Sequence, residues 1–199
     1  MKSSRKVAHL RCRCGALQGN VDSRHLYGHA VCYCKDCQAF ARYLGSPDQI
    51  LDRQGGTEIA AILPAAVKLS AGLEKLACMS LSPKGLLRWY ASCCRTPIGN
   101  TPRDRKLPYV GLIRTCLPQY DESFGPPKIA LHTKSASGDV NATPLAAFLG
   151  GMTIMSKIIG ARLRARYKEN PFFTLDSGAP IRTPQVLTLA ERRSLETAR

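Results

Sequence analysis

Apolar and polar residues alternate over much of the first 113 positions, in short runs bounded by turn residues. The runs that combine β-branched or aromatic residues with such boundaries are 29–31, 57–63, 73–81, 85–90 and 109–113. Glycine and proline pairs such as Gly55-Gly56 separate them. A short helix is predicted over 36–44, ended by Gly45. The pattern therefore predicts a mainly β domain over residues 1–140.

After about residue 140 the apolar positions recur every three or four residues, which is typical of a helix. Thr143-Pro144 supplies an N-cap and a proline at the first helical position. The residues that fall on one helical face are Leu145, Phe148, Met152, Met155, Ile159 and Leu163. If the helix continues to about Lys168, it is about 36 Å long. Asn170-Pro171 would end it, and a short terminal helix is predicted near 184–195.

This helix admits several interpretations. We favour an amphipathic helix that packs, with the tail, on the β domain and forms a C-terminal part over residues 141–199. The alternatives are a helix that binds a membrane surface or a partner protein. A membrane span is disfavoured, because the uncharged stretch 140–156 is only 17 residues long and contains Pro144 and several polar residues.

Composition places the chain among ordinary globular proteins. Of 199 residues, 44% are hydrophobic and 22% charged, which argues against disorder and fits one domain with a small appendage. The first eleven residues are basic and lack the apolar core of a signal peptide. Nine cysteines without an export signal indicate a reducing compartment, so we expect a cytoplasmic protein.

The net charge of +15 suggests nucleic acid until it is mapped along the chain. The excess is +6 over residues 1–43, +4 over 44–143 and +5 over 144–199, so it is spread out. Only 103–106 and 162–168 are dense, and neither has interleaved aromatic residues for stacking bases. We therefore expect a solvated basic surface and no nucleic-acid partner.

Seven of the nine cysteines lie in three tight groups, which carry the candidate chemistry. The groups are Cys12 with Cys14, Cys32 with Cys34 and Cys37, and the adjacent pair Cys93 and Cys94. Thiolates favour zinc, which they bind tetrahedrally at about 2.3 Å. An iron–sulfur cluster, a redox pair and chance placement are the alternatives. Cys78 and Cys116 stand alone and are expected to be buried structural thiols.

The cysteine count fits two Zn²⁺ sites better than one. The middle group supplies three ligands and would leave the fourth position of a catalytic zinc open. The outer groups together supply four sulfurs for a structural zinc. Successive side chains on an extended chain point apart, so we expect either Cys93 or Cys94 to belong to the other site.

The order of these groups resembles the glutathione-dependent formaldehyde-activating enzyme and centromere protein V family. The shared motifs are Cys-x-Cys-Gly, Cys-x-Cys-x-x-Cys, and Arg88-Trp89-Tyr90 leading to Cys94-Arg95-Thr96-Pro97, all within about 7–115. The resemblance implies an Mss4-like fold, in which small twisted antiparallel sheets are closed by zinc. It also implies a structural pair at Cys12 and Cys14 and a catalytic zinc held by Cys32, Cys34 and Cys37.

The sequence departs from the family pattern at several positions. Ala91 stands where the last motif has its first cysteine, and Arg95 replaces the glycine that follows Cys94. Cys93 is the substitute that we expect for the missing ligand. In the middle motif Tyr33 replaces the usual histidine and Gln38 a common arginine. The chain thus looks like a divergent branch of that family.

The resemblance implies a zinc-dependent carbon–sulfur lyase-type enzyme. Its substrate would be a small thiol or aldehyde, with glutathione as the thiol of an adduct similar to S-hydroxymethylglutathione. Lys35, Arg42 or Arg95 could neutralise a carboxylate of that substrate. The alternative is a non-catalytic, zinc-stabilised interaction module with a basic surface.

Overall fold

The computed structural model describes residues 7–118 and 123–197, so the basic segment 1–6 lies outside the described residues. A small antiparallel sheet forms near the N-terminus, with strand order β1-β2-β5. Its strands are β1 (Val7–Arg11), β2 (Gln18–Asp22) and β5 (Val67–Ala71). Alternate residues of β1, Ala8 and Leu10, are buried, as expected for a sheet with one face on the core.

The larger sheet has eight strands in the order β10-β3-β4-β9-β8-β7-β6-β11. They are β3 (Leu26–Cys32), β4 (Thr57–Ile62), β6 (Leu76–Ser80), β7 (Leu87–Ala91), β8 (Thr96–Thr101), β9 (Val110–Ile113), β10 (Ile129–Leu131) and β11 (Gln185–Val186). Neighbours are antiparallel except at the two edges, where β10 and β11 pair in parallel with β3 and β6. The predicted mainly β fold with a long C-terminal helix is confirmed.

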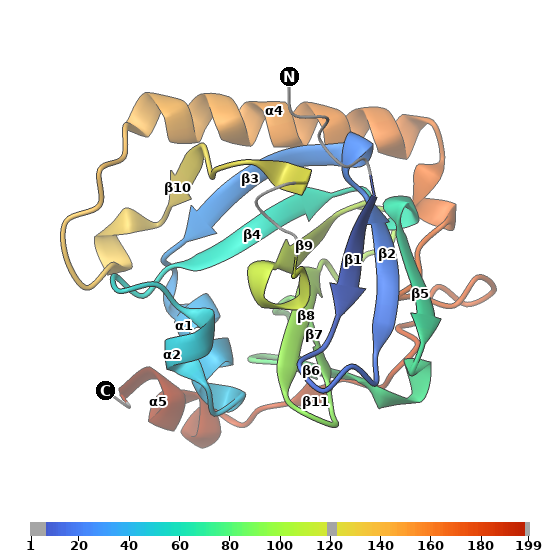
Figure 1. The fold of residues 1–199 in the computed structure, drawn as a ribbon, viewed down its shortest axis with the longest axis horizontal. Helices are drawn as coiled ribbons and strands as arrows, with labels where there is room; N and C mark the ends of the chain where they lie inside the picture. The colour runs from blue at the N-terminus through green and yellow to red at the C-terminus, as the bar shows by residue number, and fades with distance from the viewer. Residues whose placement is uncertain (1–6, 119–122, 198–199) are drawn as a thin grey trace.

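Among the described residues, α-helices accompany the sheets, and Figure 1 shows their placement. They are α1 (Lys35–Tyr43), α2 (Pro47–Ile50), α4 (Pro144–Leu163) and α5 (Leu189–Thr197). The predicted helices at 36–44 and near 184–195 correspond to α1 and α5. Helix α4 ends at Leu163, before the predicted Lys168, because Ala165 adopts a left-handed φ of 53°.

Helix α4 runs along one side of the molecule and packs on β3 and β10 (Figure 1). The contact is close: a Cβ added at Gly150 would lie 2.3 Å from Ile129 Cδ1. The Lys157 ammonium group also donates to the Leu26 carbonyl of β3 at 2.9 Å. Ile158 and Ala161 are buried on this side. The helix is therefore docked on the β body.

The periodic face expected from the sequence does not make this contact. All six of its residues are exposed, from 51% for Ile159 to 82% for Leu163. They lie opposite the residues that pack on the sheet, so both sides of α4 are apolar. By length and composition, α4 is the one helix within residues 7–118 and 123–197 that is long and apolar enough to cross a membrane, and only 11% of its apolar window is buried.

The tail after α4 belongs to the main core. Phe172 is completely buried, with its ring 5.1 Å from the ring of Trp89. Two arginines bind backbone carbonyls across this junction: Arg105 donates to Thr174 and Leu175, and Arg182 donates to Leu73 and Leu76. Part of the basic charge, expected to be solvated, thus holds the tail on the sheet.

Candidate metal centres

The first centre brings the outer cysteine groups together between the two sheets. Cys12 and Cys14 lie in the turn that joins β1 to β2, and Cys93 and Cys94 lie in the turn that joins β7 to β8. Gly15 has a φ of 79°, a left-handed conformation that lets the first turn close after Cys14. The four sulfurs all lie within 4.8 Å of one another.

The spacing of these sulfurs fits a tetrahedral metal. A zinc ion with four sulfurs at about 2.3 Å has sulfur–sulfur edges of about 3.8 Å. The Cys12 Sγ lies 3.6 Å from the Cys14 Sγ and 3.9 Å from the Cys93 Sγ. The Cys93 Sγ lies 3.3 Å from the Cys14 Sγ and 3.8 Å from the Cys94 Sγ. The donors and their separations therefore suit Zn²⁺.

The expectation that Cys93 and Cys94 belong to different sites is wrong. They do not lie on an extended strand, where side chains would alternate, but in a tight turn closed by the Arg95 N–H and the Ala91 carbonyl at 2.8 Å. Arg95 adopts a φ of 55° there, a left-handed conformation that favours glycine. Its guanidinium donates to the carbonyls of Tyr43 and Leu44.

Hydrogen bonds around the first centre differentiate its sulfurs. The Leu17 N–H donates to the buried Cys12 Sγ at 3.2 Å. Burial disfavours the thiolate of Cys94, but hydrogen bonds from Thr96 and Cys14 outweigh it and lower the pKa of Cys94 to about 6. Two effects raise the pKa of Cys93 to about 12. The first is the loss of hydration, and the second is its hydrogen bonding to the sulfurs of Cys14 and Cys94.

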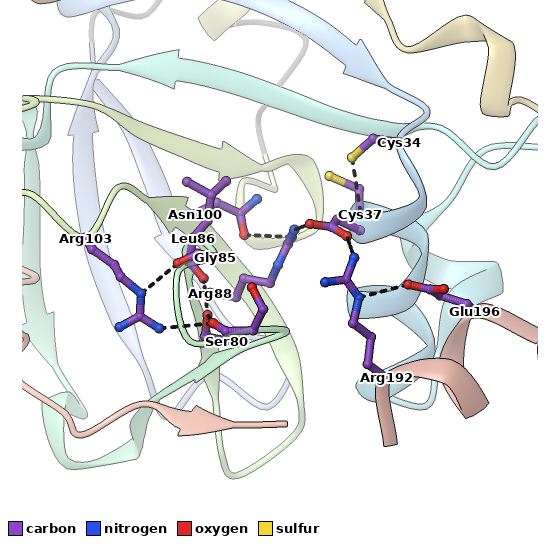
Figure 2. Close-up of polar contacts among 12 residues, drawn as sticks. Cys34, Cys37, Ser80, Gly85, Leu86, Arg88, Asn100, Arg103, Arg192 and Glu196 are labelled. Atoms are coloured by element: carbon purple, nitrogen blue, oxygen red, sulfur yellow. Dashed lines mark hydrogen bonds and ion pairs between the residues drawn. The ribbon is translucent and has the colours of Figure 1, made fainter. Parts of the chain in front are cut away.

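The second centre lies where β3 meets α1. Cys32 ends β3, Cys34 is the N-cap of α1, and Cys37 is in its first turn. The Cys34 sulfur accepts the Cys37 N–H at 3.4 Å (Figure 2). The three sulfurs lie within 4.8 Å of one another, with Cys32 and Cys37 buried and Cys34 partly exposed. Across the two described segments, 7–118 and 123–197, no fourth histidine, cysteine or carboxylate joins them.

Two features of the fold favour negative charge at the second centre. The sulfurs lie at the N-terminus of α1, where the helix dipole favours anions. Hydrogen bonds from Cys32 and Cys37, together with the positive charge of the buried Arg88 guanidinium, lower the pKa of Cys34 to about 2. The same hydrogen bonding raises the pKa of Cys32, because the three thiols share one negative charge.

Arg88 reaches the centre from β7 and is the functional candidate that the sequence reasoning missed. It is 2% exposed, donates to Asn100 Oδ1 at 3.3 Å and lies 3.7 Å from the Asp36 carboxylate (Figure 2). Its only signal was its place in the Arg88-Trp89-Tyr90 motif. Asp36 also accepts from Arg192 of α5 at 3.0 Å. The C-terminal helix is thereby tied to the residue before Cys37.

Two of the three cations that the sequence suggested for a substrate carboxylate bind backbone carbonyls instead. Arg42 donates to the Leu195 carbonyl at 3.1 Å, and Arg95 binds the end of α1 as described. Lys35 is exposed beside Cys34. The substituted Gln38 is buried and donates to the carbonyls of Tyr33 and Ser135, which is a structural role.

The isolated cysteines are buried, as predicted. Cys78 is 4% exposed and Cys116 is completely buried. Burial raises the pKa of both thiols to about 12, so they are neutral at physiological pH. All seven grouped cysteines, in contrast, take part in one of the two centres. The arrangement can hold two metal ions, one with four sulfur ligands and one with three.

Comparison with known proteins places the chain in a family but gives it no activity. No curated protein matches it. Residues 4–181 match a family of unknown function, DUF6151, so the matched region includes α4 and much of the tail as well as the cysteine centres. That region is longer than the 7–115 covered by the resemblance seen in the sequence. The chain belongs to the DUF6151 family of unknown function.

Proposed function

We propose that the protein binds two zinc ions and acts as a carbon–sulfur lyase-type enzyme on an adduct of a thiol and an aldehyde. The observation that carries the proposal is the second centre, where three sulfurs converge without a fourth donor among the described residues. Catalytic zinc sites keep such a position for water or substrate, whereas structural sites are closed. The first centre, with four sulfurs, has the closed kind of donor set.

The first centre is proposed as structural. Its two pairs of ligands come from turns of different sheets, so a metal there would join the β1-β2-β5 sheet to the eight-stranded sheet. Arg13 reinforces the junction, because its N–H donates to Thr96 Oγ1 at 3.0 Å and its guanidinium donates to the Cys94 carbonyl at 2.9 Å. Binding free energy at such a site adds to folding free energy.

The second centre is proposed as the reaction site. Zinc bound there would stabilise a substrate thiolate and polarise an aldehyde oxygen. Three thiolates would bring three negative charges against two on the metal, and the buried Arg88 guanidinium offsets the remainder. Cys34 is the sulfur nearest the solvent, so a substrate would approach from its side.

The proposed reaction is an addition and its reverse. The thiol sulfur forms a bond to the aldehyde carbon, the carbonyl π bond breaks, and the thiol proton ends on the oxygen. With glutathione and formaldehyde the product is S-hydroxymethylglutathione. The order of the three cysteine groups, which resembles the glutathione-dependent formaldehyde-activating family, supports this substrate class and an Mss4-like arrangement of the sheets.

The test combines metal content with adduct formation. Protein purified under reducing conditions should contain about two equivalents of zinc by mass spectrometry. The Cys34→Ala variant should lose about one equivalent and the acceleration of adduct formation, followed by NMR of glutathione and formaldehyde. The matched control Cys78→Ala removes a buried thiol outside both centres and should keep metal and rate. Unchanged adduct formation in Cys34→Ala would reject the enzyme.

A non-catalytic, zinc-stabilised interaction module is the second candidate. The exposed apolar face of α4 favours it, because soluble enzymes rarely leave such a surface uncovered. A second centre that holds no metal in the purified protein, together with a rate that no cysteine substitution changes, would favour this function over the first.

A further inference from the structure

The outer face of α4 is an apolar surface with Ser156 as a polar residue inside it. Its apolar members fall within an arc of about 120° at 100° per residue. They are Leu145, Phe148, Leu149, Met152, Met155, Ile159 and Leu163, all more than half exposed. At about 1.5 Å per residue, the surface extends over roughly 30 Å, the length of the helix. A patch of this size on a soluble domain marks a binding surface.

The charged residues of the helix and of the turn that follows it, up to Lys168, are all basic. From Pro144 to Lys168 the sequence contains no acidic residue. The exposed cations Arg162, Arg164 and Lys168 follow one another at the C-terminal end of the helix. A helix with an apolar face and basic residues at its border is the composition that binds anionic membrane surfaces.

A basic cavity of about 480 Å³ adjoins the same helix. Arg24, His25, Lys157, Arg164 and Arg166 line it, and so do Ser156 of the outer face and Gly160 at the border of that face. Arg24 is paired with Asp22 and Arg166 with Glu169, whereas Lys157 binds neutral carbonyls of β3 and so is held in place without losing its charge. The cavity thus places fixed positive charge where an anionic group beside the helix would lie.

We infer that α4 docks the protein on an anionic membrane surface, with its apolar face in the boundary between headgroups and acyl chains and with lipid headgroups held by the basic residues beside it. The helix lies in the plane of the membrane and does not cross it. The close contact of Gly150 with Ile129, and Lys157 on the β3 carbonyls, keep its other side on the protein. A second copy of the chain is a poorer occupant, because α4 has no acidic residue to meet the basic end of its partner.

The test is co-sedimentation of the whole protein with phosphatidylcholine vesicles, with or without phosphatidylserine. We expect the protein to bind vesicles that contain phosphatidylserine at least about tenfold more strongly than vesicles of phosphatidylcholine alone. This binding should weaken as the salt concentration rises. The combined substitutions Phe148→Gln, Met152→Gln and Ile159→Gln should abolish it. The matched control combines Leu175→Gln and Leu189→Gln, which are exposed apolar residues outside α4, and should bind as the unmodified protein does.

A second variant keeps the test valid if the apolar substitutions disturb the fold. Arg162→Gln, Arg164→Gln and Lys168→Gln leave the packed side of α4 unchanged and should remove the preference for phosphatidylserine. Circular dichroism and zinc content report the fold of each variant. Unmodified protein that stays in the supernatant with both kinds of vesicle would overturn the inference. So would a stable dimer that the apolar substitutions dissociate, because a second copy would then cover the face.

Discussion

The sulfurs of Cys14 and Cys93 lie 3.3 Å apart although 79 residues separate them in the sequence. If Cys93 is a zinc ligand, Cys93→Ser should lower zinc content by about one equivalent and lower stability at the same time. A loss of about 3 kcal/mol would lower the Tm of a chain of this size by roughly 6–12 °C. Metal analysis and thermal unfolding, with Cys78→Ser as the control, measure both. A fully metallated and stable Cys93→Ser protein would contradict the assignment.

The two neighbouring cysteines of the first centre should differ in reactivity once metal is removed. The thiolate is the nucleophile, so Cys94, with a pKa of about 6, should be alkylated at pH 7 and progressively less as the pH falls through 6. Cys93, with a pKa near 12, should stay unreacted at pH 7 and react only in strongly alkaline solution, although it is the more exposed. Mass spectrometry of iodoacetamide-treated peptides distinguishes them. Faster labelling of Cys93 at pH 7 would refute this ordering.

Arg88 should matter for the second centre and not for the first. Arg88→Gln removes the buried positive charge that offsets the three thiolates, so zinc affinity of the second centre should fall by about tenfold or more. Arg103→Gln is a matched control, because Arg103 donates to the carbonyls of Gly85 and Ser82 in the same region (Figure 2) and the cysteine on which its charge acts is Cys78, outside both centres. Competition with a chromophoric chelator measures the two zinc affinities. If both substitutions lowered the zinc affinity of the second centre equally, the charge of Arg88 would not specifically stabilise that centre.

Two adjacent glycines of α4 provide a paired test of its docking. Gly150→Ala would place a Cβ 2.3 Å from Ile129 Cδ1 and should destabilise the protein by about 1–3 kcal/mol. Gly151→Ala meets nothing within 4 Å and should stabilise the helix by about 0.5–1 kcal/mol. Chemical denaturation gives both values. The same sign for both substitutions would mean that α4 does not pack on β10 as described.

Arg95 occupies a left-handed conformation that favours glycine. Arg95→Gly relieves that strain but loses the bonds to the carbonyls of Tyr43 and Leu44, whereas Arg95→Ala loses the bonds and keeps the strain. The alanine variant should therefore be about 1 kcal/mol less stable than the glycine variant. Denaturation midpoints of the two proteins give this difference. An alanine variant as stable as the glycine variant would show that the turn has changed its conformation.

Besides the three strands of the small sheet, the sequence missed β8, β10 and β11, which lack the signals on which prediction depends. β8 contains Pro97, Gly99 and Asn100, which read as turn residues, yet it is fully buried between β7 and β9. β10 and β11 have three and two residues and pair in parallel with strands far away in the chain. No local pattern encodes such pairings, because they are set by tertiary packing.

The candidate site was more accessible to sequence reasoning than its surroundings. Cysteine spacing identified the residues of both clusters that could hold a metal, since metal ligands on one turn are close in sequence. It misplaced the relation between Cys93 and Cys94 because the turn geometry depends on a left-handed Arg95. For α4, the periodicity identified an apolar face but not whether that face packs on the sheet or faces solvent. The side that packs on the sheet, with Ile154 and Ile158, is apolar as well.

The first centre also bears on the order of events in folding. Cys14 leaves the ribosome long before Cys93, and the chain between them must place six strands, β2 to β7, before the four sulfurs can meet. Closing so long a loop is slow and entropically costly, so the complete site forms late. A nascent chain would thus expose unpaired thiols from the appearance of Cys12 at least until Cys94 has left the ribosome. Zinc supply should then control how much protein matures, in addition to how stable the mature protein is.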